Sequence, residues 1–168
     1  MRYIVKEFDK PLLIFSADMN SSNSNLQIEK IYEENDAFFP LNLTVSNGGL
    51  ESWLKHRVIP KNRAYVDALL SKTGLSANRP LGIIAVCKGL SLNDCYWVDS
   101  ADNESSFAKV NLYDNRFSTI LASIAFTGYG SSVRSSLFSS PEFSTNGMLP
   151  KCWRRINGKI YLDKGGTS

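Results

Sequence analysis

The dipeptide Asn157-Gly158 constrains the fold of this chain more than any other local feature, because it separates two short runs of alternating apolar and polar residues. Asn and Gly tolerate the positive φ angles that both central residues of a type I′ turn require, so the pair predicts a β-hairpin. We expect its strands over 152–156 and 159–162. A polar, glycine-bearing loop over 144–151 precedes the predicted hairpin.

A glycine-bearing loop followed by a hairpin with a lysine on its returning strand has the parts that a nucleotide phosphate site needs. Backbone N–H groups reach phosphate oxygens where no side chain blocks them, and a fixed ammonium group neutralises their charge. A simpler interpretation stays open, with Gly147 in an ordinary turn and Lys164 at the end of an exposed hairpin. The local residues alone favour that simpler interpretation.

The carboxyl-terminal stretch resembles the HipA-like serine/threonine kinases, the toxin half of bacterial toxin–antitoxin pairs. In that family a Ser-x-x-Gly-x-x-x-Lys loop covers the nucleotide, and Ser144, Gly147 and Lys151 match it at the right spacing. The family's nucleotide-anchoring lysine lies on the following hairpin and corresponds to Lys164. The resemblance also implies that Ser144 is the loop serine that such kinases autophosphorylate. It therefore implies a nucleotide-binding set of six residues: Ser144, Thr145, Asn146, Gly147, Lys151 and Lys164.

Four longer segments extend the resemblance over much of the chain. They are WLKHRVIPKNRAYVDALLSKTGL, CKGLSLNDCYWV, FTGYGSS and SSPEFSTNGMLPKCWRR. The whole chain is similar to the amino-terminal part of a larger bacterial variety of these proteins. We therefore expect a HipA-like amino-terminal α+β region over 1–130, a Ser-rich linker over 131–140, and the phosphate loop and hairpin of a truncated kinase N-lobe over 141–168.

The resemblance does not extend to catalysis. Such kinases keep their catalytic and metal-binding aspartates further along, in a helical lobe, and this sequence has no His-Arg-Asp or Asp-Phe-Gly element. We therefore expect no catalytic residue and no activity of the chain alone, with ATP and Mg acting as cofactors only if a catalytic lobe is supplied. The expected role is regulatory or partner-binding, and the expected partner is that lobe or an antitoxin.

Composition excludes several other classes of function. The three cysteines have no CxxC spacing and the chain has one histidine, so no zinc site is expected. No apolar run approaches the roughly 20 residues that span a bilayer. We expect a cytoplasmic protein with no membrane contact and with reduced thiols.

A DNA-associated accessory or regulatory protein is the alternative hypothesis. Helices are expected over 50–57 and 62–73, and the short connection between them suits a helix-turn-helix. The basic residues lie in that connection rather than along the second helix, and the net charge is only +3. A third interpretation is a structural interaction domain with a vestigial loop.

The rest of the chain predicts an α+β fold with small antiparallel sheets and several helices. A hairpin is expected over 2–17, a strand over 26–32, a short strand over 95–98 and a further helix over 117–126. The apolar run ending at Lys88 is predicted as a helix, although its β-branched residues also suit a strand. Asp94 is predicted as a turn residue and His56 as the end of a helix. The polar segment 99–106 is predicted as a surface loop.

Overall fold

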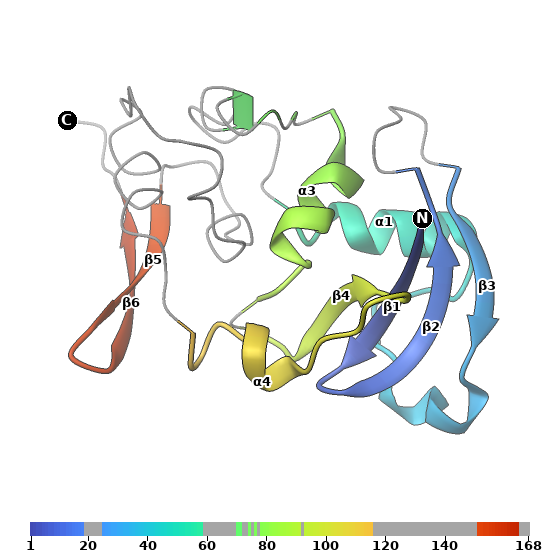
Figure 1. Ribbon diagram of the computed structural model, residues 1–168, viewed down its shortest axis with the longest axis horizontal. Helices are drawn as coiled ribbons and strands as arrows, with labels where there is room; N and C mark the ends of the chain where they lie inside the picture. Colours follow the sequence, from blue (N-terminus) through green and yellow to red (C-terminus); the bar gives the residue numbers. More distant parts are fainter. Residues whose placement is uncertain are drawn as a thin grey trace.

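A computed structural model shows a mixed α+β protein with a four-stranded antiparallel sheet, a separate two-stranded sheet and several short helices (Figure 1). It describes residues 1–18, 25–58, 70–71, 74, 76, 78–91, 93–115 and 151–164, and within the last range it describes side chains over 156–161 only. The predicted fold class is confirmed. The predicted linker over 131–140, the helix over 117–126 and most of the helix over 62–73 lie outside the described residues.

The larger sheet has the strand order β3-β2-β1-β4, and every neighbouring pair is antiparallel. Its strands are β1 (Arg2–Glu7), β2 (Lys10–Ser16), β3 (Gln27–Ile31) and β4 (Tyr96–Ser100). The first three form a meander, and β4 returns from much later in the sequence to pair with the other edge of β1 (Figure 1). The predicted amino-terminal hairpin and the third strand are therefore confirmed, and β4 lies slightly later than predicted.

Two helices carry apolar side chains to one face of this sheet. The helix α1 (Asn47–Lys55) buries Leu50, Trp53 and Leu54, which recur at i, i+3 and i+4. The helix α3 (Pro80–Cys87) confirms the helical interpretation of that run, with proline in its first turn. With nine residues, α1 is the longest helix in the described part of the chain, so none there reaches the length that crosses a bilayer.

The sheet has a hydrophobic cluster on each face, because successive side chains of a strand point to opposite sides. Val98 of β4 joins the main core, which also contains Val5, Phe15 and the buried residues of α1 and α3. Trp97, its neighbour in the strand, belongs to the smaller cluster with Phe107 of α4 (Phe107–Val110). Trp97 is fully buried, so this second cluster fixes β4 on the face away from α1 and α3.

The prediction of a surface loop over 99–106 is wrong at its start. Asp99 lies in β4 and is only 2% exposed. Its carboxylate accepts a hydrogen bond from Lys88 Nζ at 2.6 Å and another from the backbone N–H of Ser105. A carboxylate can be buried when it is paired and hydrogen-bonded, which the polar composition of the segment does not reveal. The 3-10 helix η1 (Glu33–Phe38) was also not predicted.

The carboxyl-terminal hairpin forms as predicted, with somewhat longer strands. They are β5 (Lys151–Ile156) and β6 (Lys159–Lys164). Asn157 has a φ of 50° and Gly158 a φ of 76°, as a type I′ turn requires. The turn sets the register, which runs from Ile156 opposite Lys159 to Lys151 opposite Lys164.

Two adjacent glycines in the first turn of α1 are expected to respond in opposite ways to alanine. A Cβ at Gly49 would lie 2.2 Å from the backbone oxygen of Thr44, whereas a Cβ at Gly48 would meet nothing within 4 Å. We expect Gly49→Ala to lower the free energy of unfolding by about 1–3 kcal/mol through this clash. We expect Gly48→Ala to leave it unchanged or to raise it by up to about 1 kcal/mol, because alanine favours helix. Urea denaturation of both variants tests the pair, and equal effects would contradict the geometry of this turn.

Candidate functional site

The nucleotide site implied by the family resemblance lies partly outside the described residues. Ser144, Thr145, Asn146 and Gly147 belong to that part of the chain, and the backbone is described at Lys151 and Lys164. These two lysines are direct partners across the β5-β6 ladder, at the end of the hairpin away from the turn. The hairpin therefore brings together two positions 13 residues apart that the resemblance assigns to one ligand.

This register has an electrostatic consequence. Like charges at directly opposed positions of an antiparallel ladder destabilise it. A bound polyanion removes that cost, because it places compensating charge beside both positions. At the turn end of the same hairpin, Lys159 pairs with the apolar Ile156 and has no opposing cation. The pairing of lysines is thus confined to the end that adjoins the predicted phosphate loop.

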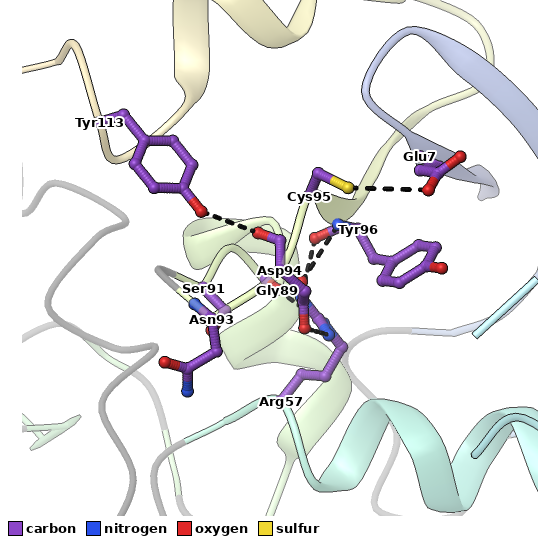
Figure 2. A network of polar contacts seen from close by, with 9 residues as sticks. All are labelled: Glu7, Arg57, Gly89, Ser91, Asn93, Asp94, Cys95, Tyr96 and Tyr113. Atoms are coloured by element: carbon purple, nitrogen blue, oxygen red, sulfur yellow. Dashed lines mark hydrogen bonds and ion pairs between the residues drawn. The ribbon is translucent and has the colours of Figure 1, made fainter. Parts of the chain in front are cut away.

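A second cluster of polar residues is centred on Arg57 (Figure 2). Its guanidinium binds the Asp94 carboxylate in a bidentate pair, with Nη1 2.9 Å from Oδ2 and Nη2 2.7 Å from Oδ1. The same group donates to the backbone oxygens of Gly89 and Tyr96, each at 2.7 Å. The Arg57 side chain is only 8% exposed. Three of these hydrogen bonds tie the end of α1 to the loop between α3 and β4, and the fourth ties it to the first residue of β4.

Neighbouring groups fix both members of this ion pair. Asp94 Oδ1 also accepts the backbone N–H of Tyr96 at 3.1 Å, which confirms the predicted turn role of Asp94. The guanidinium carbon of Arg57 lies 4.6 Å from the centre of the Trp53 ring, close enough for a cation–π contact. Trp53 in turn meets Tyr96 edge to face. The pair is therefore held from both the helix and the strand.

Sequence reasoning missed the role of Arg57, although one signal for it was present. Arg57 falls seven, four and three residues after Leu50, Trp53 and Leu54, so it continues the buried stripe of α1 beyond the helix end. Arg57 belongs to the segment WLKHRVIP and Asp94 to CKGLSLNDCYWV. Two of the segments that carry the family resemblance are thus joined by one ion pair.

The same contacts bear on the DNA-associated alternative. Arg57 is the last residue of the first predicted helix, and four of its five guanidinium N–H donors are bound inside the protein. With a side chain only 8% exposed, Arg57 is poorly placed to bind a phosphate. His56 is the C-cap of α1, as predicted, and its Nδ1 lies 2.7 Å from the backbone oxygen of Ser52. The second predicted helix is described only at residues 70–71, so the alternative stays a prediction.

Two observations bear on metal binding and on thiol reactivity among the described residues. No group of three potential metal ligands occurs among them. Burial raises the pKa of the Cys87 thiol to about 11. Burial and the nearby Glu7 carboxylate also raise the pKa of Cys95. Both shifts disfavour the thiolate, which is the reactive form of a cysteine side chain.

Comparison with known proteins adds no relative. No family model, no curated protein and no solved structure matches this chain. The HipA-like resemblance therefore stays a prediction that depends on the segments quoted above and on the residues at the hairpin.

Proposed function

We propose that this chain is an amino-terminal module of a HipA-like kinase that holds the phosphates of ATP without transferring them. The observation that supports this best is the pairing of Lys151 with Lys164 across the β5-β6 ladder. Both positions match nucleotide-binding lysines of the family, and the opposed like charges favour a polyanionic ligand. The aspartates that bind Mg and catalyse transfer come from a helical lobe outside these 168 residues.

The module's role is regulatory or partner-binding, within a bacterial toxin–antitoxin kinase system of the cytoplasm. Its partner is the catalytic lobe or an antitoxin. The free thiols of Cys87 and Cys95 suit the reducing conditions of that compartment. The Arg57–Asp94 ion pair keeps two segments of the module in a fixed arrangement. A surface of the module that binds a partner needs such a fixed arrangement.

The test is a calorimetric titration of the chain with ATP and Mg. We expect binding with a Kd on the order of 1 mM, because the hairpin and loop supply only part of a nucleotide site. Lys151→Met and Lys164→Met should each weaken binding about tenfold, the effect of losing one charge-assisted hydrogen bond. Lys159→Met is the matched control, because it removes the same charge from the turn end of the same hairpin, and it should change the Kd less than about twofold.

Two results would overturn the proposal. One is the absence of any heat of binding at ATP concentrations of about 10 mM, ten times the expected Kd. The other is an equal loss of affinity in the Lys159 and Lys164 variants, which would indicate non-specific attraction to positive charge. A parallel titration with duplex DNA should show no binding at low salt. Binding that weakens steeply with added salt would instead favour the DNA-associated alternative.

A further inference from the structure

The chain contains three Asn-Gly dipeptides, at 47–48, 146–147 and 157–158. In such a dipeptide the backbone nitrogen of glycine can attack the carboxamide carbon of asparagine, because glycine has no side chain to obstruct the approach. The pair at 146–147 lies outside the described residues. The other two pairs are described, and their surroundings decide which asparagine reacts first.

The two described pairs are alike in exposure and in the space around them. Asn47 and Asn157 are both exposed. A Cβ built on Gly48 or on Gly158 would meet no atom within 4 Å, so neither glycine is crowded. A difference in reactivity between the pairs therefore comes from hydrogen bonds and from backbone conformation.

The carboxamide of Asn47 is held at both of its polar atoms. Its Oδ1 accepts the backbone N–H of Ile28 at 2.9 Å, and its Nδ2 donates to Gln27 Oε1 at 3.0 Å. Its backbone belongs to the first turn of α1. Attack by the nitrogen of Gly48 requires the carboxamide to turn and the backbone to rotate, so it breaks the contacts with β3 and distorts the start of the helix.

Asn157 lies in the two-residue turn of the β5-β6 hairpin instead. Its carboxamide makes no hydrogen bond within the described part of the chain. The ladder ends at the pair of Ile156 with Lys159, so the backbone N–H of Gly158 takes no part in it. Rotation of the turn disturbs only this end of the hairpin. Attack by Gly158 on Asn157 therefore breaks fewer contacts than the same reaction at the start of α1.

We propose that Asn157 is a modification site, at which the folded chain deamidates by intramolecular attack. The nitrogen of Gly158 bonds to Cγ of Asn157 and the Cγ–Nδ2 bond breaks. Nδ2 leaves as ammonia, together with the proton that the glycine nitrogen gives up. Water then opens the succinimide ring. Opening at the side-chain carbonyl gives aspartate, whereas opening at the main-chain carbonyl gives isoaspartate, which has an extra carbon in the backbone.

The isoaspartate form affects the whole hairpin, because the turn sets its register. That register runs from Ile156 opposite Lys159 to Lys151 opposite Lys164. An extra backbone carbon changes the geometry of the turn, so the modification weakens the pairing of Lys151 with Lys164. A consequence for ATP rests on the proposed function, whereas the reaction itself does not.

The experiment incubates the full chain at mildly alkaline pH and follows each Asn-Gly pair by mass spectrometry. Cleavage after lysine places the three pairs on separate peptides, 31–55, 110–151 and 152–159. We expect Asn157 to deamidate at least about tenfold faster than Asn47, because two neutral hydrogen bonds must break at Asn47. In urea the two sites should react at similar rates, since both asparagines precede glycine.

Gln27→Ala tests the cause of the difference. It removes the acceptor of Asn47 Nδ2, so deamidation at Asn47 should become about fivefold faster, the effect of one neutral hydrogen bond. Deamidation at Asn157 should not change in this variant, because Gln27 belongs to the other sheet.

Hydrogen exchange of the separated isoaspartate form measures the effect on the hairpin. The backbone amides of β5 and β6 should lose protection, while those of β1 and β2 should keep it. Equal deamidation rates at Asn47 and Asn157 in the folded chain would overturn the proposal, as would unchanged protection of β5 and β6 in the isoaspartate form. Failure of the hairpin to bind ATP would leave all of these results unaffected.

Discussion

Arg57→Ala is expected to lower the free energy of unfolding by about 3 kcal/mol, the lower end of the range for breaking a buried ion pair. The lower end applies because Asp94 is 31% exposed and can regain some hydration when its partner is removed. The backbone oxygens of Gly89 and Tyr96 lose their donor in the same variant. Unsatisfied buried acceptors add to the cost, so the loss should well exceed that of any exposed arginine. Urea denaturation of the full chain measures it.

Two further variants separate the geometry of Arg57 from its charge. Arg57→Lys keeps the charge but lacks the planar fork that binds a carboxylate through two nitrogens, so it should recover less than half of the loss. Lys55→Ala removes an exposed cation that pairs with Glu51 one turn earlier, and it should cost less than about 0.5 kcal/mol. A cost in Arg57→Ala no larger than in Lys55→Ala would contradict the role of Arg57 in joining the two segments.

Asp99→Asn is expected to destabilise the protein by about 2–3 kcal/mol at neutral pH, because it replaces charge-assisted hydrogen bonds inside the protein. Burial by itself raises the pKa of Asp99, but the hydrogen bond from Lys88 and the backbone N–H of Ser105 outweigh burial, and the pKa lies below its usual value of 3.8. A carboxylate with a lowered pKa in the folded state stabilises the protein above its unfolded pKa. That contribution disappears as the pH falls through the folded pKa.

The difference in the free energy of unfolding between wild type and Asp99→Asn should therefore be constant from about pH 5 to pH 7 and should shrink below about pH 4. The matched control is Asp102→Asn, since Asp102 is 66% exposed and lies 3.8 Å from Arg2. It should cost less than about 0.5 kcal/mol at every pH. Urea denaturation across this pH series gives the result, and a pH-independent difference between wild type and Asp99→Asn would contradict the ion pair with Lys88.

The elements that the sequence predicted correctly are those with local signals. Asn157-Gly158 determines a turn by its own φ preferences, and Ser46 caps α1 by accepting the N–H of Gly49 three residues later. The α+β class follows from such signals, because each hairpin and helix is encoded within a few residues. The strand β4 was also predicted from its local sequence. Its pairing with β1 was not predicted, because β1 lies about 90 residues earlier in the chain.

The features that sequence reasoning missed depend on residues distant in the chain. Arg57 and Asp94 are 37 residues apart, and nothing in either neighbourhood indicates the other. Asp99 belongs to a polar segment, and its burial depends on Lys88, which precedes the strand and has a positive φ of 52°. Similarly, the pairing of Lys151 with Lys164 is found only by counting residue pairs along both strands from the turn to the far end of the hairpin. Polar residues are hard to place from local sequence, because their burial is decided by a partner rather than by a pattern.

Backbone amide signals of the ¹⁵N-labelled chain, followed during addition of ATP and Mg, test the nucleotide proposal most directly. The largest changes should occur at Lys151, at Lys164 and across the loop 144–147, while Asn157 and Gly158 at the turn of the same hairpin should stay nearly unchanged. Changes centred on the four-stranded sheet, or no change at any amide, would contradict the claim that this hairpin holds the phosphates of a nucleotide.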